Sequence, residues 1–140
     1  MNGNANNAPR DDVITVLIAD DDEDILELVH RGLSDSGYEI LLARDGATAL
    51  AAARERKPAL ALLDIGMPEL DGFEVTSALK SDPATKAIVV ILFTARSEAS
   101  DVEKGYEAGA DDYLVKPFTL KTLQSRVAAA LERATGTAHS

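Results

Sequence analysis

Cysteine and tryptophan are both absent from this 140-residue sequence, and aromatic residues make up 4% of it. Without cysteine the chain has no disulfide framework, no thiolate metal ligand and no cysteine nucleophile. Proteins of a reducing compartment commonly lack disulfides, so we expect a cytoplasmic location. Long apolar runs are absent too: none approaches the ~20 residues of a membrane-spanning helix, and the polar N-terminus has no signal-peptide core. We therefore expect no membrane partner.

Basic residues are scarce, with 14 Lys and Arg against 24 Asp and Glu, which leaves a net charge of -10. Proteins that bind a phosphate backbone usually carry the opposite sign, so direct nucleic-acid binding is not expected. The length suits one domain. We expect a disordered tail over residues 1–12, one domain over 13–133 and a short C-terminal tail over 134–140. Polar tails at both ends favour a complete single-domain protein.

Short apolar runs alternate with helical patterns along the rest of the chain. Runs rich in β-branched residues, without polar alternation, are typical of buried parallel strands. The expected strands cover residues 13–19, 38–43, 59–64, 87–94 and 112–115. The expected helices cover residues 23–33, 46–56, 73–81, 97–109 and about 119–133. This alternation predicts right-handed crossovers and an α/β fold, a doubly wound five-stranded parallel sheet with five helices covering both faces.

Apolar spacing predicts which faces of the first two helices are buried. A helix that covers a sheet carries an apolar stripe at intervals of three and four residues. The first helix is expected to bury Ile25, Leu28, Val29 and Leu33. The Ala-rich second helix is expected to turn Leu50 inward.

Polar side chains follow four of the five expected strands, where ligands bind in open α/β sheets. The strands end in Asp20 and Asp21, in Asp64, in Thr94 and in Lys116, whereas the second ends in Ala43 and delivers no polar side chain. Each of these residues alone has an ordinary structural explanation, such as a helix cap, a strand threonine or a solvated lysine. Their coincidence at one edge of the sheet favours a functional site.

The predicted cluster carries more negative than positive charge. Three carboxylates close together need a cation, and Lys116 alone is too little. Oxygen ligands favour Mg²⁺, which commonly shares a site with a phosphoryl group. Lys116 and Thr94 would then bind further phosphoryl oxygens, and this arrangement suits phosphoryl transfer. Because no Walker-type glycine loop is present to hold a nucleotide, we expect a protein carboxylate, Asp64, to accept the phosphoryl group.

An alternative interpretation of the acidic run is a Ca²⁺ loop of the EF-hand type. Asp20, Asp22 and Asp24 match its first three ligand positions. The sixth position holds Ile25 where glycine is needed, and the twelfth holds Arg31 where glutamate is needed, so this interpretation fails. Instead, we expect Asp22 to cap the following helix, with the next two acidic residues in its first turn.

Four segments, in this order and at this spacing, carry a family resemblance: "VLIADDDEDI", "LLDIGMPELDGFEV", "ILFTAR" and "GADDYLVKPF". From residue 13 to about 133 the chain resembles the receiver domain of bacterial two-component response regulators. Each segment alone is a weak signal, whereas the combination is highly specific. The resemblance implies the flavodoxin-like strand order 2-1-3-4-5, which puts the first and third strands side by side.

The resemblance implies a role for each residue of the predicted site. Asp64 is expected to be the phosphoacceptor. Asp21 is expected to bind Mg²⁺ directly and Asp20 to bind it through water, with the backbone carbonyl of Gly66 as a further ligand. Lys116 is similar to the lysine that pairs with the phosphoryl group.

Further roles that the resemblance implies concern the conformational switch. Thr94 is similar to the hydroxyl that moves toward the phosphoryl group, and Tyr113 to the aromatic residue that then turns inward. Ala95 is expected to keep access to the acyl phosphate open. The Lys116–Pro117 peptide bond is expected to be cis.

A signalling switch, and not an enzyme for external substrates, is the implied function. The expected phosphodonor is a histidine kinase or a histidine phosphotransfer protein, and water later hydrolyses the acyl phosphate. Phosphorylation is expected to change the surface of the fourth helix, fifth strand and fifth helix, which binds an unidentified downstream protein or a second copy. Gly66 leaves the path of the water unshielded, whereas Arg96 either shields it or binds phosphate.

Other interpretations stay open. The chain is either a stand-alone switch, a receiver from a larger regulator or hybrid kinase, or a scaffold module that is not phosphorylated. The scaffold is less favoured because every expected site residue is present. A phosphatase with an aspartate nucleophile needs a second Asp where this chain has Gly66. Tyr106 either belongs to a partner-binding surface or packs against the fifth strand.

Overall fold

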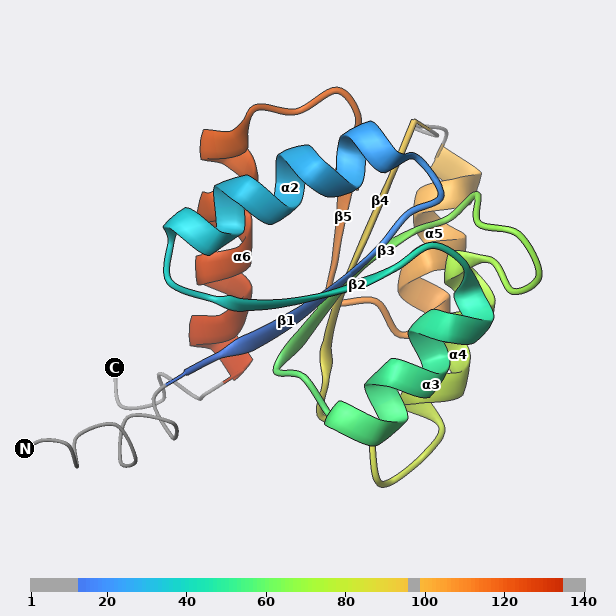
Figure 1. Ribbon diagram of the computed structural model, residues 1–140. Coiled ribbons are helices and arrows are strands. Elements are labelled where there is room, and N and C mark those ends of the chain that lie inside the picture. Colours follow the sequence, from blue (N-terminus) through green and yellow to red (C-terminus); the bar gives the residue numbers. More distant parts are fainter. Residues whose placement is uncertain (1–12, 96–98, 135–140) are drawn as a thin grey trace, which may run out of the picture.

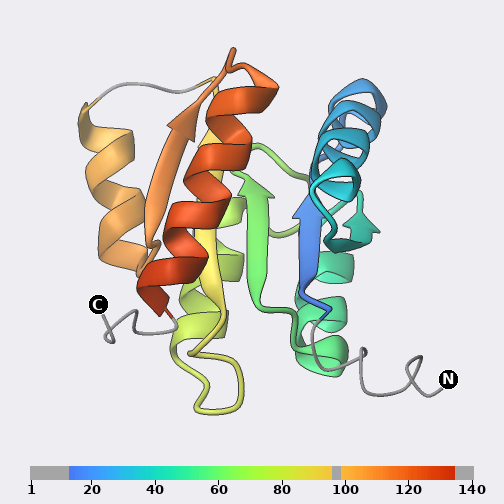
Figure 2. The ribbon, with the colours of Figure 1, turned by 90° about the vertical axis from the view of Figure 1, so that its left-hand side faces the viewer.

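A computed structural model describes residues 13–95 and 99–134 of the chain. Within these ranges five strands form one parallel sheet in the order β2-β1-β3-β4-β5, which confirms the predicted fold class. Their arrowheads all point toward the same edge (Figure 2). The strands are β1 (Thr15–Ala19), β2 (Glu39–Ala43), β3 (Leu60–Asp64), β4 (Val89–Thr94) and β5 (Asp112–Val115).

Helices cover both faces of the sheet (Figure 1). Two of them, α2 (Glu23–Asp35) and α6 (Leu120–Ala134), lie on one face. The other face carries α3 (Gly46–Arg56), α4 (Gly72–Lys80) and α5 (Ala99–Ala108). Every residue of β3 and β4 is buried, as expected for central strands covered on both sides. The sheet therefore separates two apolar layers, and its edges are left for polar groups.

The buried face of α2 differs from the prediction. Leu26, Val29 and Leu33 are buried, whereas Leu28 is 46% exposed, so the expected inward position of Leu28 is wrong. Leu28 lies about 200° around the helix from Leu26. Both stripes have helical spacing and share two residues, so spacing alone does not choose between them. In α3 the buried positions are Gly46, Ala49 and Ala53, and Leu50 packs half-buried against the core.

Four strands begin later than the sequence pattern suggested. Val13 and Ile14 are 44% and 39% exposed and precede β1. The second strand begins at Glu39 and the third at Leu60, each one residue late. The fourth begins at Val89 because the chain before it forms a turn, in which the Ile88 N–H donates to the Thr85 carbonyl at 2.9 Å. The apolar runs in the sequence therefore begin a residue or two before the hydrogen-bonded strands do.

At the amino edge of the sheet, Lys80 joins three segments. Its Nζ donates to the carbonyl oxygens of Ile88 at 2.7 Å and Lys86 at 3.3 Å, and to Asp111 Oδ2 at 3.1 Å. The same Asp111 oxygen accepts the Val90 N–H at 2.8 Å. The end of α4 is thereby tied to the starts of β4 and β5.

Four expectations concern, wholly or in part, residues that the structure does not describe: the tail over 1–12, Arg96, the first two residues of the helix expected over 97–109, and the C-terminal residues after Ala134. Across the two described ranges, no helix combines the length and the apolar character that a membrane crossing needs.

Candidate functional site

Three carboxylates meet at the carboxyl edge of the sheet, beside the paired strands β1 and β3. Asp20 and Asp21 follow β1, and Asp64 ends β3, whose Leu63 lies opposite Ala19 in register. One oxygen from each carboxylate lies within 4.8 Å of the others. Asp20 and Asp64 are 1% and 7% exposed, whereas Asp21 is exposed to solvent. The cluster is therefore buried on one side and accessible on the other.

Lys116, directly after β5, faces the two buried carboxylates. Its Nζ lies 2.9 Å from Asp20 Oδ2 and 3.7 Å from Asp64 Oδ1. Burial, followed by the negative charge of Asp20, raises the pKa of Asp64 to about 6. Lys116 and a hydrogen bond from the Gly66 N–H act in the opposite direction and do not outweigh these effects. The site holds more negative charge than its own lysine neutralises.

This donor set fits a hard divalent cation. All three groups offer carboxylate oxygens, the ligands that Mg²⁺ prefers, and no nitrogen or sulfur ligand joins them in the described cluster. Burial and the charge of Asp20 raise the pKa of Asp64, and a cation held by these carboxylates would favour its ionised form. Exposed Asp21 leaves room on the solvent side for the waters that Mg²⁺ retains.

The remaining predicted residues lie around this cluster. Thr94 ends β4 and is 4% exposed, one residue beyond Phe93, which lies opposite Asp64 in register. Gly66 is exposed, and a Cβ built on it would lie 3.9 Å from Asp64 Oδ2, so its missing side chain leaves space over that oxygen. Ala95 is also exposed.

Tyr113 lies in β5, and its side chain is buried at 6% exposure. A Cβ built on Gly105 of α5 would lie 3.0 Å from the Tyr113 ring, so the helix packs directly on that ring. The Lys116–Pro117 bond is cis, as predicted. Tyr106 is 47% exposed, and burial, followed by the charge of Asp112, raises its pKa. These proximities place α5 and β5 in contact beside the site.

The acidic run divides as the sequence predicted. Asp22 is the N-cap of α2, and its side chain accepts the Asp24 N–H at 2.9 Å and the Ile25 N–H at 3.4 Å. Glu23 and Asp24 occupy the first turn, where the helix dipole favours negative charge. Asp20 Oδ1 accepts the Asp22 N–H at 2.9 Å, which links the carboxylate cluster to the helix start.

Arg44, directly after β2, is a neighbour of the site that the sequence interpretation missed. The expectation that the second strand delivers no polar side chain is wrong in this respect. Arg44 donates through Nε and, at 3.2 Å, through Nη2 to the Glu23 carboxylate in the first turn of α2. The Ala43 carbonyl accepts the Asp20 N–H at 3.1 Å, so Arg44 follows a residue tied to the cluster. The sequence signal was the basic residue one position past the apolar run.

Two glycines let other segments approach the loop that follows Asp64. A Cβ on Gly72 would lie 2.7 Å from the Asp64 carbonyl oxygen, and one on Gly46 would lie 1.9 Å from the Leu70 carbonyl oxygen. Neither position tolerates a side chain unless the backbone moves. Both glycines follow an Asp that caps their helix, so an Asp-Gly pair before a helical pattern was the signal. Glu69, in the loop between Asp64 and Gly72, has a positive φ of 71°.

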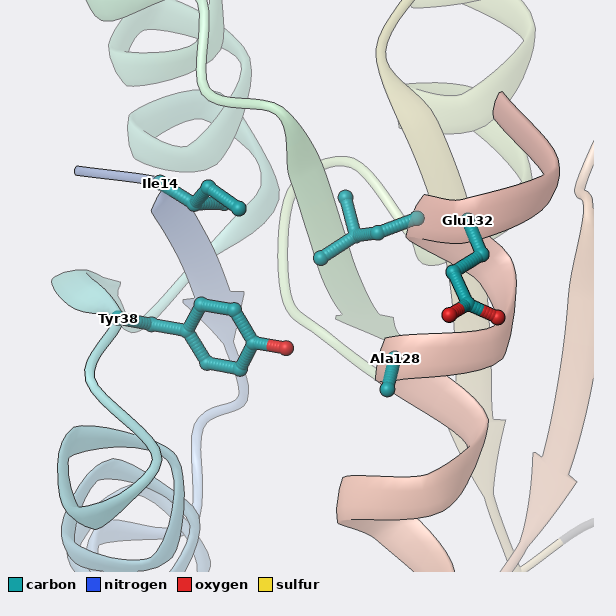
Figure 3. A pocket seen from close by; sticks show the side chains of 5 residues that line it. Ile14, Tyr38, Ala128 and Glu132 are labelled. Carbon is teal, nitrogen blue, oxygen red and sulfur yellow. The ribbon is translucent and has the colours of Figure 1, made fainter. Parts of the chain in front are cut away.

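The described part of the chain also has hollows away from the carboxylates. One, of about 270 Å³, lies at the amino edge, where Ile14 and Tyr38 face Ala128 and Glu132 of α6 (Figure 3). Its lining is mostly apolar and holds one carboxylate. Two others lie along the exposed side of α2. The carboxylate cluster and Lys116 lie at the opposite end of the sheet from the hollow in Figure 3.

Five parallel strands in the order 2-1-3-4-5, with a carboxylate cluster and a lysine at their carboxyl edge, define a CheY-like doubly wound α/β fold. A family model of the response regulator receiver domain matches residues 16–128. The chain therefore belongs to the response regulator receiver domain family, as the sequence segments indicated.

Relatives that share this domain include two transcriptional regulatory proteins. The transcriptional regulatory protein PrrA of Mycobacterium tuberculosis is 49% identical over 125 residues, which are 89% of this chain and 53% of PrrA. The alkaline phosphatase synthesis transcriptional regulatory protein PhoP of Bacillus subtilis is 40% identical over 118 residues, 84% of this chain and 48% of PhoP. This chain spans about half the length of both relatives.

Solved structures show the same fold. The chemotaxis response regulator CheY4 of Vibrio cholerae is 31% identical, with a TM-score of 0.80, and the match covers 84% of this chain and 98% of CheY4. The BeF3-activated DrrB receiver domain is 34% identical, with a TM-score of 0.77, and the match covers 86% of this chain and 99% of that domain. Both are covered almost completely, so the likeness extends over the whole domain.

Proposed function

We propose that this receiver is a phosphorylation-activated signalling switch and that Asp64 accepts the phosphoryl group. The observation that carries the proposal is the meeting of Asp20, Asp21, Asp64 and Lys116 at one edge of the sheet. A histidine kinase or a histidine phosphotransfer protein is the proposed donor, acting in the cytoplasm. We assign the switch to residues 13–133.

Asp64 acts as the nucleophile. Its carboxylate oxygen attacks the phosphorus of a phosphohistidine, the P–N bond breaks, and the imidazole leaves with the electron pair. With a pKa of about 6, the carboxylate is mostly ionised at neutral pH and able to attack. Lys116, 3.7 Å from Asp64 Oδ1, pairs with a phosphoryl oxygen, and the Thr94 hydroxyl donates to another.

Asp20, Asp21, Asp64 and the Gly66 carbonyl are the proposed holders of Mg²⁺. When bound, the ion supplies positive charge to the phosphoryl oxygens and offsets the repulsion between the carboxylates. Asp20 also accepts a hydrogen bond from the Asp22 N–H, which holds its carboxylate in place independently of any ion. Exposed Gly66 and Ala95 leave a path for the water that later hydrolyses the acyl phosphate.

The signal leaves through the surface of α5, β5 and α6. Movement of Thr94 toward the phosphoryl group opens space that the buried Tyr113 ring, packed under α5, would fill. Arg126 of α6 donates to both oxygens of Asp112, at 2.7 and 2.8 Å, and to the Tyr113 carbonyl at 3.2 Å. A shift of β5 is therefore passed to α6, and this surface would bind a downstream protein or a second copy.

Mapping the modified residue tests the proposal. The protein is incubated with Mg²⁺ and acetyl phosphate, and the aspartyl phosphate is located by mass spectrometry after reduction of the acyl phosphate. We expect label on Asp64 and none in Asp64→Asn. Asp35→Asn, which changes an exposed carboxylate at the end of α2, is the matched control and keeps full labelling. Unchanged labelling in Asp64→Asn would contradict the assignment.

A second proposal is that the receiver controls an output segment of a longer regulator. The supporting observation is that PrrA and PhoP are named transcriptional regulatory proteins and are about twice as long as the matched part. The net charge of -10 does not favour contact of this domain with a phosphate backbone. Any contact with DNA is therefore assigned to a segment outside the receiver, and a DNA-binding assay of this chain alone is expected to be negative.

A further inference from the structure

The Lys116 ammonium has a third neighbour besides the two carboxylates. Its Nζ lies 5.0 Å from the centroid of the Phe93 ring. Phe93 stands in β4 directly opposite Asp64 in register, so the same pair of strands presents the ring and the proposed nucleophile. A cation within about 6 Å of an aromatic face is attracted by the ring quadrupole. The ammonium is therefore bounded by two anions and one ring.

The Phe93 ring is buried and packs against a second aromatic ring. It is fully buried, at 0% exposure, and the Phe118 ring lies 5.9 Å away, centroid to centroid, at an interplanar angle of 54°. This tilted geometry is a favourable one for an aromatic pair. A buried ring is also desolvated on its inner side, where attraction between a cation and an aromatic face is stronger than at an exposed site.

We propose that Phe93 is a positioning residue that, together with Asp20, holds the Lys116 ammonium beside Asp64; the inference rests on the proposed phosphorylation of Asp64. Asp20 contacts the ammonium at 2.9 Å and Asp64 at 3.7 Å, so the ion is closer to the neighbour than to the reacting group. The ring restricts the ammonium to this position without competing for the phosphoryl group, because it carries no formal charge. If Phe93 only filled space in the core, any ring of the same size at this position would support the same rate of Asp64 phosphorylation.

Fluorination of a single ring separates these two roles. Each added fluorine withdraws electrons from the aromatic face and weakens its attraction for a cation, while the ring keeps nearly the same shape. Phe93 is replaced site-specifically by mono-, di-, tri- and pentafluorinated phenylalanine. The rate of Asp64 phosphorylation by acetyl phosphate with Mg²⁺ is expected to fall stepwise, by about tenfold over the series. The loss is expected in the maximal rate, with little change in the acetyl phosphate concentration at half-maximal rate.

The chain contains a matched control for this experiment. Lys104 of α5 lies 4.7 Å from the centroid of the Phe73 ring, in a second contact between a lysine and an aromatic face. The same fluorinated series at Phe73 is expected to leave the phosphorylation rate within twofold of the wild-type rate. In a Lys116→Gln background, fluorination of Phe93 is expected to have no further effect, because the cation is gone.

A nuclear magnetic resonance measurement keeps the test independent of activity. In the metal-free wild type, the Cε protons of Lys116 are expected to be shifted by the Phe93 ring current, and Phe93→Leu removes this shift. Absence of the shift would overturn the inference. A flat rate across the Phe93 series, or equal losses at Phe93 and Phe73, would also overturn it, provided that the wild type is phosphorylated. Failure of the wild type to be labelled on Asp64 would instead contradict the proposed function.

Discussion

Two lysines stand at opposite edges of the same sheet and are equally exposed. The side chains of Lys80 and Lys116 each retain 20% exposure. At the amino edge, Lys80 donates to two backbone carbonyls and to Asp111, which itself accepts a backbone N–H. At the carboxyl edge, Lys116 contacts two carboxylates and an aromatic ring. Residue type and burial are alike in the two places, and the partners differ.

The partners decide what each lysine is able to do. An ammonium has three donors, and those of Lys80 are all directed at acceptors that belong to the fixed backbone or are bound to it. The partners of Lys116 are the carboxylates that we propose to bind Mg²⁺ and the phosphoryl group. A ligand that changes their charge would release the ammonium, whereas no ligand is proposed at the amino edge. Lys80 is thus part of the scaffold, and Lys116 is available for reaction.

The largest expected effect separates the two lysines by rate. Lys116→Gln is expected to slow phosphorylation of Asp64 about a hundredfold, because a positive charge beside the transferring phosphoryl group is lost. Lys80→Gln is expected to stay within about threefold of the wild-type rate, because it lies at the other edge of the sheet. Rates are measured as aspartyl phosphate formed from acetyl phosphate with Mg²⁺. Equal losses in the two variants would remove the distinction between scaffold and site.

In the stability of the fold, unlike in the phosphorylation rate, the loss of Lys80 is expected to matter whether or not Mg²⁺ is present, and the loss of Lys116 only without Mg²⁺. Lys80→Gln should lower the free energy of unfolding by about 2–3 kcal/mol, because the Ile88 carbonyl and Asp111 lose their donor. This loss is expected to be the same with Mg²⁺ and with a chelator. Lys116→Gln should destabilise the protein with a chelator and recover when Mg²⁺ is added. Urea unfolding under both conditions measures the difference, and a Mg²⁺-dependent loss in Lys80→Gln would argue against its scaffold role.

Sequence patterns predicted the carboxyl edge better than the amino edge. The order of apolar runs and polar residues located Asp64, Thr94 and Lys116, because each directly follows or ends a buried strand. Lys80 and Asp111 are 31 positions apart, and neither differs in the sequence from an ordinary surface charge. Their contact depends on how α4 and the start of β5 meet in space, which no local pattern encodes.

The sequence patterns also did not predict which face of a helix is buried against the sheet. Ile25, Leu26 and Leu28 are all apolar, and the helix buries Leu26 while Leu28 stays exposed. The choice follows from how α2 lies on the sheet, and helical spacing permits either face. The close approach of Gly46 to the Leu70 carbonyl depends in the same way on contact between segments far apart in sequence.

The two edges are expected to respond to pH with opposite signs. Burial and Asp20 raise the pKa of Asp64 to about 6, so its contribution to stability is present below an unfolded pKa near 4 and is lost as the pH rises through 6. Burial tends to raise the pKa of Asp112, but hydrogen bonds from Arg126 and the Tyr113 N–H bring it below its ordinary value. Asp112 therefore stabilises the fold above the unfolded pKa, and this is lost as the pH falls.

Two asparagine variants test this contrast in the metal-free protein. At pH 8, Asp64→Asn should raise the free energy of unfolding by about 2 kcal/mol, because a buried charge without sufficient compensation is removed. Asp112→Asn should lower it by about 1 kcal/mol, because the ion pair with Arg126 is lost. The Asp64→Asn difference should shrink as the pH falls through 6 toward 4, whereas the Asp112→Asn difference should stay nearly constant down to about pH 4 and shrink only below it. Chelator-treated samples unfolded with urea between pH 4 and pH 8 give the measurement, and effects of the same sign would contradict it.

The smallest expected effect concerns backbone strain at each edge. Lys57, at the C-cap of α3, and Glu69, in the loop after Asp64, have positive φ values of 45° and 71°. Glycine adopts this region without steric cost, so Lys57→Gly and Glu69→Gly should each raise the free energy of unfolding by about 0.5–1 kcal/mol. Alanine at either position keeps a Cβ and is the matched control, with no gain expected.

Rate again distinguishes the two glycine variants. The loop that contains Glu69 leads from Asp64 to Gly72, whose backbone packs on the Asp64 carbonyl. Extra freedom in that loop should reduce the phosphorylation rate about twofold in Glu69→Gly while stability rises, since a flexible loop holds the acceptor less firmly. Lys57→Gly should gain stability with an unchanged rate, because it lies at the edge that we assign to the scaffold. A faster or unchanged rate in Glu69→Gly would mean that the loop conformation does not help to position Asp64.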